Sequence, residues 1–431
     1  MNKSILRLAI PNIISNITVP LLGMADLYIV GHLESEDYIG AIALVTMIFN
    51  FIYWSFSFLR MGASGFTAQA YGAGNHRELT NILLRSLAVA LTAGVVIILF
   101  QYLIAYAGFY LLNGEPAVKQ YAQSYFYTYI WAAPAILGMY AFNGWYAGMQ
   151  NAKAPMTVAI GVNIVNIGLS FAFVYGLGMK IEGVALASVC AQYTGFLSFF
   201  MIWNMKYDRL KQYLDFEILK NLSSYIPFFK VNGDIFIRTM ALVAVTTFFM
   251  SASAKSGKDV LAANALLMQL FILFSYMMDG FAYAAEALTG KFIGAKDRIQ
   301  LIFLVKRLFL WGIAVASFFT LAYILFLEQI LGTLTDKQNI IEFSKQFHIW
   351  VYMIPIAGFS AFLWDGVFVG ATASRQMRNS MLIAVAVFFA LYIAFSDIYA
   401  DNILWIAFII YLVSRGIVQS FMASSVLNDS K

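Results

Sequence analysis

The sequence predicts an all-α integral membrane protein with twelve transmembrane helices, arranged as two parallel-repeat six-helix lobes around a central cleft. Three observations lead to this prediction: an apolar composition, long continuous apolar runs and an internal repeat. Of the 431 residues, 61% are hydrophobic and only 11% are charged, and the mean hydropathy is +0.77. A soluble domain carries about 25% charged residues. Too few polar residues are therefore present to cover a soluble protein of this length.

Twelve apolar stretches are long enough to cross a bilayer as helices, which takes about 20 residues each. The runs are continuous and lack the alternation that marks the strands of an outer-membrane barrel, so the spans are predicted to be helical. The expected spans are 4–31, 39–70, 82–112, 117–149, 155–177, 181–204, 217–250, 259–292, 299–331, 339–372, 378–397 and 402–426.

The basic residues of the predicted loops indicate the orientation of the chain. Seventeen of the 27 Lys and Arg residues lie in the termini and one set of alternate loops, and six lie in the other set. The six are Lys119, Lys180, Lys255, Lys258, Lys337 and Lys345. Because cytoplasmic loops carry an excess of Lys and Arg, both termini are predicted to be cytoplasmic. The net charge of +5 reflects these loops rather than a nucleic-acid-binding surface.

Two short motifs recur at a fixed interval. Residues 71–75 (Tyr-Gly-Ala-Gly-Asn) resemble residues 293–297 (Ile-Gly-Ala-Lys-Asp). Residues 143–148 (Asn-Gly-Trp-Tyr-Ala-Gly) resemble residues 365–370 (Asp-Gly-Val-Phe-Val-Gly). Both pairs are offset by 222 residues. Chance similarity among glycine-rich helices is the alternative, but two matches at one offset favour a duplication.

The repeat divides the chain into an N-terminal lobe (1–205), a charged cytoplasmic linker (206–220) and a C-terminal lobe (221–431). Each lobe holds six predicted spans. Because six is an even number, the lobes share one orientation and are related by an axis along the membrane normal. This plan is typical of secondary transporters, whose substrate path runs between the two halves.

A carboxylate lies within the first predicted span. Asp26 would face hydrocarbon unless it points into a protein cavity, and a charge at the centre of a span costs about 2.5–3.5 kcal/mol. Such residues commonly bind a proton or an ion. The alternative is that Asp26 is hydrated near the periplasmic end of the helix and helps to end the span. Pro11 and Pro20 precede Asp26 and are candidate hinges, because a proline inside a helix removes a hydrogen bond.

Neutral polar residues in neighbouring spans are candidate partners of this carboxylate. Asn163 and Asn166 are three residues apart in the fifth span and share one helix face, and Ser188 lies in the sixth span. Neutral partners would let a carboxylate gain and lose a proton without locking it into an ion pair. The alternative is that these residues only join helices through interhelical hydrogen bonds.

Charged residues also occur in the predicted spans of the second half. Asp234 and Arg238 have the i, i+4 spacing of an intrahelical ion pair, which favours structural support over a substrate contact. Asp279 and Glu286 are seven residues apart on one face of the eighth span. Either could attract a cation, or Glu286 could lie near the cytoplasmic end. Asp365 stands where the first half of the repeat has asparagine, and it is a candidate ion or substrate contact.

Together these segments resemble the multidrug and toxic compound extrusion (MATE) transporters, and most closely their DinF-like branch. The matching segments are 26–32, 71–75, 232–239, 279–286, 365–370 and 377–380. The resemblance implies export of organic cations or amphiphilic drugs in exchange for H⁺ or Na⁺ across the bacterial cytoplasmic (inner) membrane. In family members of this type, the acid that matches Asp26 is the proposed proton site. The proline that matches Pro11 marks the place where the helix bends.

One departure from the family pattern bears on the coupling ion. Some relatives carry a second acid in the fifth span, within a Leu-Asp pair, where this chain has Leu169-Ser170. A lobe with a single acid is poorly suited to Na⁺, which favours several oxygen ligands. We therefore expect H⁺ coupling through Asp26, with Na⁺ as the alternative. In the Na⁺-dependent branch an acid lies near the position of Asp365.

Other classes of function find little support in the sequence. The single cysteine, Cys190, excludes an internal disulfide, and the three histidines are scattered, so no metal site is expected. No phosphate-binding loop and no His-Glu-x-x-His motif occurs, so we expect neither an enzyme nor an ATP-driven pump. We expect no cofactor beyond the coupling ion, no nucleic-acid partner and a monomer in the lipid bilayer.

The alternative function is a flippase for a lipid-linked sugar or a phospholipid, because members of the same superfamily share this architecture. A pyrophosphate headgroup would favour several cationic residues along the central path. Outside the predicted loops the chain offers only Arg60, Lys230, Arg238 and Arg415. The resemblance to the MATE transporters, rather than this count of cations, implies an organic cation or amphiphile as the small-molecule substrate.

Overall fold

The computed structural model describes residues 1–33, 35–112, 115–399 and 402–428, and every regular element in these ranges is helical. This confirms the predicted all-α membrane fold. Eleven helical segments of the described residues are long and apolar enough to cross a membrane. The predicted span 117–149 is also helical, but it is interrupted by a short 3₁₀ turn and is rich in tyrosine and glutamine.

The chain folds into two compact units. One unit comprises residues 14–229, and the other comprises residues 1–13 together with 230–431. The first helix, α1 (Asn2–Gly31), therefore contributes its first thirteen residues to one unit and the remainder to the other. The predicted linker 206–220 lies wholly inside the 14–229 unit.

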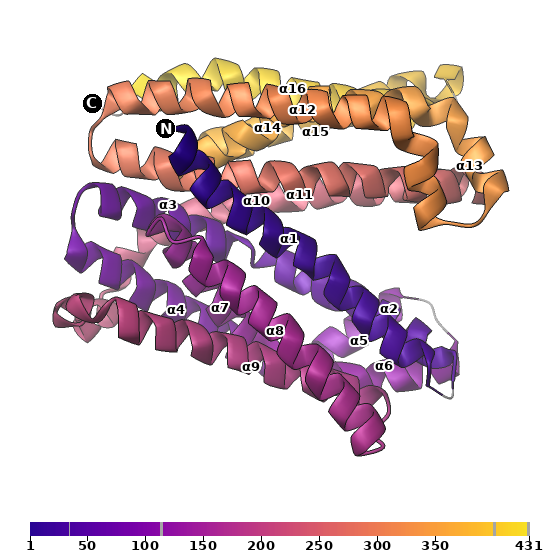
Figure 1. Ribbon diagram of the computed structural model, residues 1–431, viewed down its shortest axis with the longest axis horizontal. Helices are drawn as coiled ribbons and strands as arrows, with labels where there is room; N and C mark the ends of the chain where they lie inside the picture. The colour runs from indigo at the N-terminus through magenta and orange to yellow at the C-terminus, as the bar shows by residue number, and fades with distance from the viewer. Residues whose placement is uncertain (34, 113–114, 400–401, 429–431) are drawn as a thin grey trace. The chain divides into compact units, whose positions relative to one another are not determined.

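Helices and short helical turns build the 14–229 unit. They are α2 (Asp37–Ser55), α3 (Phe58–Gly72), α4 (His76–Leu99), α5 (Gln101–Leu111), α6 (Pro116–Tyr129), η1 (Ile130–Ala132), α7 (Ala133–Gly148), α8 (Lys153–Phe171), the π-helical turn η2 (Ala172–Gly176), α9 (Ile181–Lys206), η3 (Asp208–Tyr213), η4 (Phe216–Lys220) and η5 (Leu222–Tyr225). Within this unit α7 packs against α3, α4 and α9, and α8 packs along α9 (Figure 1).

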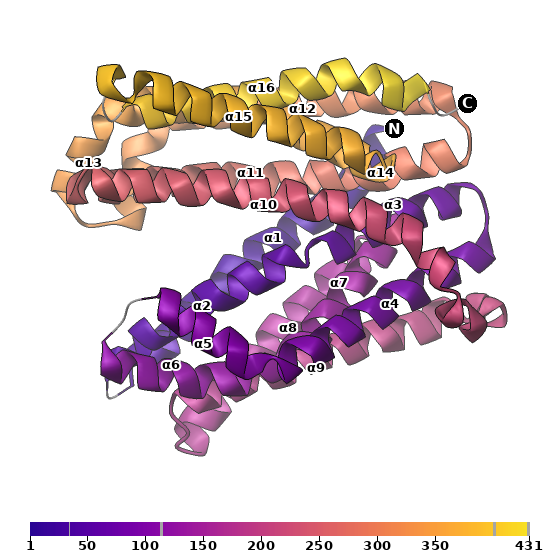
Figure 2. The same cartoon turned by 180° about the vertical axis from the view of Figure 1, so that it is seen from behind.

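The other unit is built from longer helices. They are α10 (Ile226–Lys255), α11 (Lys258–Gly294), α12 (Arg298–Leu334), α13 (Gln338–Ser344), η6 (Lys345–Phe347), α14 (His348–Gly370), α15 (Ser374–Tyr399) and α16 (Asn402–Asn428). Figures 1 and 2 show α11, α12, α14 and α16 running side by side, with α14 in contact with the other three. This central position explains why α14 is apolar and largely buried along its length.

Several buried aromatic side chains in each unit hydrogen-bond through their hydroxyl or indole groups to neighbouring helices, as such groups usually do when they are buried. In the 14–229 unit the Trp145 Nε1 donates to the Leu79 carbonyl oxygen at 2.8 Å. In the other unit the Trp405 Nε1 donates to the Asn264 Oδ1 at 2.8 Å, and the Tyr323 hydroxyl donates to a backbone carbonyl oxygen at 2.7 Å. These bonds tie neighbouring helices together inside the apolar cores.

Glycines of the sequence repeat serve the same purpose in both units. A Cβ atom on Gly144 of α7 would overlap the carbonyl oxygen of Arg60 on α3. A Cβ atom on Gly366 of α14 would overlap the carbonyl oxygen of Ala282 on α11. Each pair of positions is related by the offset of 222 residues. The repeat therefore encodes a close backbone-to-backbone helix crossing that only glycine permits at these positions.

The turns after these helices repeat as well. Gln150 and Thr372 follow α7 and α14 with φ of 62° and 54°, and Gly74 and Lys296 follow α3 and α11 with φ of 65° and 56°. Each pair is again offset by 222 residues. Three of these left-handed positions hold a side chain, which is uncommon for residues other than glycine. Two units with matching strained turns indicate that each folds on the same plan.

Adding a methyl group at either crossing is expected to destabilise the protein. Gly144→Ala and Gly366→Ala would force the paired backbones apart, and overpacking of this kind costs about 1–3 kcal/mol. The midpoint of thermal unfolding in detergent should fall for both variants. Gly161→Ala on α8 is the control, because among the described residues no atom outside the local backbone of α8 lies within 4 Å of the added Cβ. Equal midpoints for all three variants would contradict the close crossing.

The predicted seventh span, 217–250, begins later than expected, because residues 216–225 form 3₁₀ turns and the apolar segment starts at Ser223. These turns are fastened to α4. The Arg77 Nη2 donates to the Asp215 Oδ2 at 2.7 Å, and the Thr80 hydroxyl donates to the Tyr213 carbonyl oxygen at 3.0 Å. The Arg77 hydrogen bond holds the pKa of Asp215 below its ordinary value. The contribution of this ion pair to the stability of the fold is present at neutral pH and is lost as the pH falls through that lowered pKa.

Candidate functional site

Asp26 lies in the last two turns of α1, within the 14–229 unit. Its side chain is half-buried. Its Oδ1 atom is buried and accepts no hydrogen bond from any residue that the structure describes. Burying a carboxylate oxygen without a donor is unfavourable, more so when the group is charged. A proton or a polar ligand on this oxygen would remove that cost.

Two tyrosines of α6 lie near this position. Tyr125 and Tyr129 of α6 lie within electrostatic range of Asp26. Their rings are 5.8 Å apart, and the ring of Tyr53 on α2 is 6.5 Å from that of Tyr129. The buried hydroxyl of Tyr53 has no hydrogen-bond partner among the described residues. We call Tyr53, Tyr125 and Tyr129 the tyrosine cluster.

The tyrosine cluster was missed in the sequence, because aromatic residues make up 17% of the whole chain. A local signal was nevertheless present. Residues 121–129 (Tyr-Ala-Gln-Ser-Tyr-Phe-Tyr-Thr-Tyr) contain four tyrosines. Two of them, Tyr125 and Tyr129, have the i, i+4 spacing that places side chains on one helix face. That face is turned toward the interior, where both residues contact other aromatic rings.

The neutral partners predicted for Asp26 occupy the same unit but bond to other groups. The Asn163 Nδ2 donates to the Thr18 carbonyl oxygen on α1 at 3.0 Å. The Asn166 Nδ2 donates to the Ser188 hydroxyl at 2.7 Å, which joins α8 to α9. Ser188 also interacts with Tyr125 of the tyrosine cluster. Asn163 therefore contacts the helix that carries Asp26. Asn166 and Ser188 are linked to the surroundings of Asp26 through Tyr125.

The two candidate hinges lie in different surroundings. Pro11 is buried and Pro20 is exposed, and both lie inside the continuous helix α1. The division between the two compact units falls after Ile13, two residues beyond Pro11. In the unit that contains residues 1–13, Gly280 of α11 approaches α1 so closely that a Cβ atom added to it would lie 3.0 Å from the Ala9 carbonyl oxygen. The start of α1 is therefore packed tightly on α11, and the proline lies at the edge of that contact.

The other unit contains a buried ionic cluster around Asp365 of α14. Its Oδ2 accepts hydrogen bonds from Arg238 of α10 and Arg415 of α16, and its Oδ1 accepts one from the Gln419 Nε2 at 2.6 Å. The side chains of Asp365, Arg238 and Arg415 are 9%, 13% and 3% exposed. Two guanidinium groups therefore enclose one carboxylate. We call Asp365, Arg238, Arg415 and Gln419 the Asp365 cluster.

The intrahelical ion pair predicted between Asp234 and Arg238 is wrong. The Asp234 carboxylate accepts hydrogen bonds from the Arg378 Nη1 at 2.5 Å and the Ser374 hydroxyl at 2.9 Å, both on α15. Arg238 instead joins the Asp365 cluster. Each residue finds a partner on a neighbouring helix, where burial strengthens the interaction more than an exposed i, i+4 pair would be strengthened.

The two acids of α11 lie on a helix that packs along α14. Asp279 is half-buried, whereas Glu286 is only 2% exposed. The carbonyl oxygen of Glu286 lies at the close crossing with Gly370 of α14. Glu286 is therefore a buried residue of the helix interface. Among the described residues, no three His, Cys, Asp or Glu side chains gather as metal ligands.

Removing one arginine of the Asp365 cluster should be tolerated better than removing its carboxylate. Arg238→Gln leaves Asp365 paired with Arg415 alone, which is a neutral combination. The expected loss is that of one hydrogen bond to a charged group, about 1.5–3 kcal/mol. Thermal unfolding in detergent should show a smaller decrease for Arg238→Gln than for Asp365→Asn. A decrease as large as that of Asp365→Asn would contradict this charge balance.

Comparison with known proteins decides the family. The family model MatE matches residues 11–172 and again residues 235–396. The chain belongs to the MatE family. The two matched segments start 224 residues apart, in agreement with the duplication seen in the sequence motifs. Family membership confirms the resemblance found in the sequence, and it makes this MatE protein a multi-pass membrane transporter rather than an enzyme.

Individual relatives support the same assignment. The MatE protein is 36% identical over 418 residues to DNA damage-inducible protein F of Escherichia coli (strain K12), covering 96% of this chain and 90% of that protein. It is 26% identical to the probable multidrug resistance protein NorM of Synechocystis sp., over 85% of this chain and 79% of the relative. The crystal structure of the Vibrio cholerae MATE transporter VcmN in the bent form has the same fold. The TM-score is 0.89 at 15% identity, and the match covers 99% of this chain and 97% of that one.

Proposed function

We propose that this transporter is a secondary antiporter that exports organic cations or amphiphilic drugs in exchange for H⁺, with Asp26 as the coupling carboxylate. The observation that carries the proposal is the buried Oδ1 atom of Asp26, which has no donor among the described residues. A proton on this carboxyl would remove the cost of burying its charge. The relative named as a probable multidrug resistance protein supports the substrate class.

Proton coupling fits the composition of the site better than sodium coupling. The described surroundings of Asp26 offer tyrosine hydroxyls rather than a second carboxylate. In the other unit, both oxygens of Asp365 are engaged by arginine and glutamine donors, so a cation would have to displace a guanidinium group. We therefore assign Asp365, Arg238 and Asp234 to structural support. Asp279, which is half-buried, stays a candidate for a substrate contact, whereas the burial of Glu286 at the interface of α11 and α14 favours a structural role.

In the proposed cycle, a proton enters from the periplasm and binds Asp26. Neutralisation of the carboxylate lets α1 bend, with Pro11 and Pro20 as hinges, because proline weakens the helix locally. The drug leaves outward, the transporter reorients, and the proton is released to the cytoplasm. Asn163, Asn166 and Ser188 hold the first half of the helix bundle around Asp26 during these changes. The protein acts as a monomer in the bacterial inner membrane, with both termini in the cytoplasm.

Reconstituted transport tests this function. Purified protein in liposomes is loaded with a fluorescent organic cation, and efflux is recorded under an imposed pH gradient or an imposed Na⁺ gradient separately. The pH gradient should drive efflux and the Na⁺ gradient should not. Efflux driven only by Na⁺ would contradict proton coupling. Displacement of the dye by a lipid-linked pyrophosphate, with no gradient dependence, would favour the flippase alternative.

A further inference from the structure

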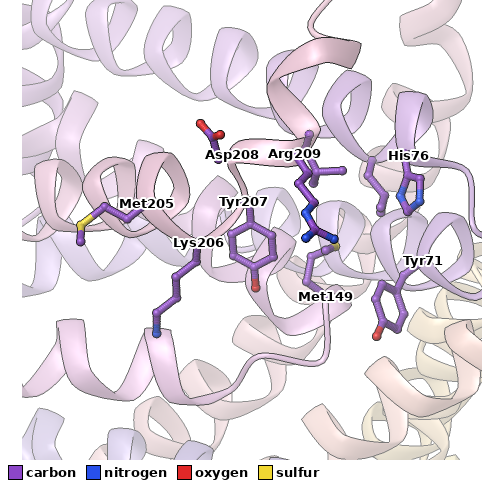
Figure 3. A pocket seen from close by; sticks show the side chains of 10 residues that line it. Tyr71, His76, Met149, Met205, Lys206, Tyr207, Asp208 and Arg209 are labelled. Atoms are coloured by element: carbon purple, nitrogen blue, oxygen red, sulfur yellow. The ribbon is translucent and has the colours of Figure 1, made fainter.

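We propose that a pocket at the membrane-interface end of the 14–229 unit binds a phosphate group that carries net negative charge, supplied by an anionic phospholipid headgroup or by free phosphate. The pocket has a volume of about 430 Å³. It is lined by the ends of four helices, with Tyr71 from α3, His76 from α4, Met149 after α7, and Lys206 with Tyr207 at the end of α9. Figure 3 shows these side chains gathered around the cavity.

The charge of the pocket is positive and uncompensated. Lys206 and Arg209 are both exposed, and neither is paired with a carboxylate in the part of the chain that the structure describes. Asp208 lies between them in sequence, but its Oδ1 is paired with the Lys211 Nζ at 2.7 Å. In Figure 3 the carboxylate of Asp208 is turned away from the guanidinium group of Arg209. The two cations are therefore available to an anion.

A hydroxyl donor is already oriented in this pocket. The Asn151 Nδ2 donates to the Tyr207 hydroxyl oxygen at 3.0 Å. The Tyr207 ring is fixed by Trp145, with ring centroids 4.9 Å apart and an interplanar angle of 79°. Because this hydroxyl oxygen accepts from Asn151, its own proton is free to be donated to a phosphate oxygen. A guanidinium, an ammonium and a hydroxyl donor together match the acceptors of a phosphate group.

The position of the pocket favours a lipid headgroup as the source. Three apolar segments have one end at the pocket: the first ends at Gly72, the second begins at His76 and the third ends at Lys206. The pocket therefore lies where these segments meet the polar boundary of the membrane. Met205 also lines the pocket and is 74% exposed, which offers an apolar surface beside the cations. Basic pockets at this level of a membrane protein bind anionic headgroups, and each Lys or Arg near an anionic surface strengthens binding.

The test compares two double variants of the full-length protein. Lys206→Gln with Arg209→Gln removes the cations of the pocket. Lys220→Gln with Arg375→Gln is the control, because it removes the same charge from exposed residues that do not line the pocket. Native mass spectrometry measures phosphatidylglycerol retained by each protein, and a parallel titration measures binding of inorganic phosphate. Whichever of the two ligands the unmodified protein binds, phosphatidylglycerol or inorganic phosphate, the pocket variant should bind it at least about tenfold more weakly than the control variant.

The two arms distinguish the sources. Weakened phosphatidylglycerol binding, unaffected by millimolar phosphate, assigns the pocket to a lipid headgroup. Weakened binding of phosphate alone assigns it to the free anion. Equal binding by the two double variants in both arms, or no binding by the unmodified protein in either arm, would overturn the proposal. Lys206→Arg with Arg209→Lys keeps both charges and should retain the ligand, which separates loss of charge from loss of folding.

Discussion

Replacing Asp26 with asparagine should reduce export driven by a pH gradient to the level of empty liposomes. Asparagine has the shape of the carboxyl group but cannot take up and release a proton at neutral pH. The variant should fold normally, because the buried Oδ1 atom of Asp26 has no hydrogen-bond partner to lose among the described residues. Efflux of a fluorescent organic cation from proteoliposomes is the measurement, with size-exclusion chromatography to confirm that the variant is monodisperse.

The control for this experiment is Asp336→Asn, which removes an exposed carboxylate from the turn between α12 and α13. It should transport as the unmodified protein does. If Asp26→Asn exported the dye with undiminished dependence on the pH gradient, Asp26 would not be the coupling residue. Tyr129→Phe removes one hydroxyl within electrostatic range of the carboxyl and should weaken, rather than abolish, this dependence.

The largest effect on stability is expected for Asp365→Asn. This change leaves the guanidinium groups of Arg238 and Arg415 buried without a carboxylate. Breaking a buried ion pair by removing one partner typically costs about 3–5 kcal/mol. Here the cost should lie at the upper end, because one carboxylate serves two arginines. Thermal unfolding in detergent, followed by intrinsic fluorescence, should show a clearly lower midpoint together with a reduced monodisperse fraction.

Two further variants separate charge from packing in this prediction. Asp365→Asn combined with Arg415→Gln removes one charge of each sign and should recover part of the lost stability, because only Arg238 is then left uncompensated. Asp336→Asn again serves as the exposed control. If Asp365→Asn unfolded at the same temperature as the unmodified protein, the Asp365 cluster would not carry the structural role given to it.

The fold could be predicted from the sequence because its determinants are local and repeated. Continuous apolar runs of about 20 residues leave helices as the only spanning structure. Gly144 and Gly366 are part of the repeated motif in the sequence, and they are also the positions of the close helix crossings. The ends of the helices were harder to predict from the sequence. The break between α4 and α5 at Phe100 lies within a stretch that was predicted as one continuous span, and the 3₁₀ turns at 216–220 and 222–225 lie where the seventh span was predicted to begin.

The partners in the candidate site could not be predicted, because they depend on distant parts of the chain. Asp365 and Arg415 are 50 residues apart in sequence, and Asp234 and Arg378 are 144 apart. Spacing along one helix favoured Asp234 with Arg238, and it contains no information on which helix lies opposite. The special position of Asp26 could be predicted, because a single carboxylate within an apolar span is visible in the sequence. Its tyrosine neighbours could not be predicted, because they come from α6, about a hundred residues later in the sequence.

The central claim is that Asp26 is the coupling carboxylate of a proton antiporter, which requires that binding of the substrate favours release of the proton. The most direct measurement is proton release from the purified transporter in weakly buffered detergent solution as an organic cation is added. Binding at two linked sites is reciprocal, so a substrate that favours the deprotonated carboxyl must displace its proton. The unmodified protein should release protons in a saturable manner, and Asp26→Asn should release none. Equal release by Asp26→Asn and the unmodified protein would contradict the account.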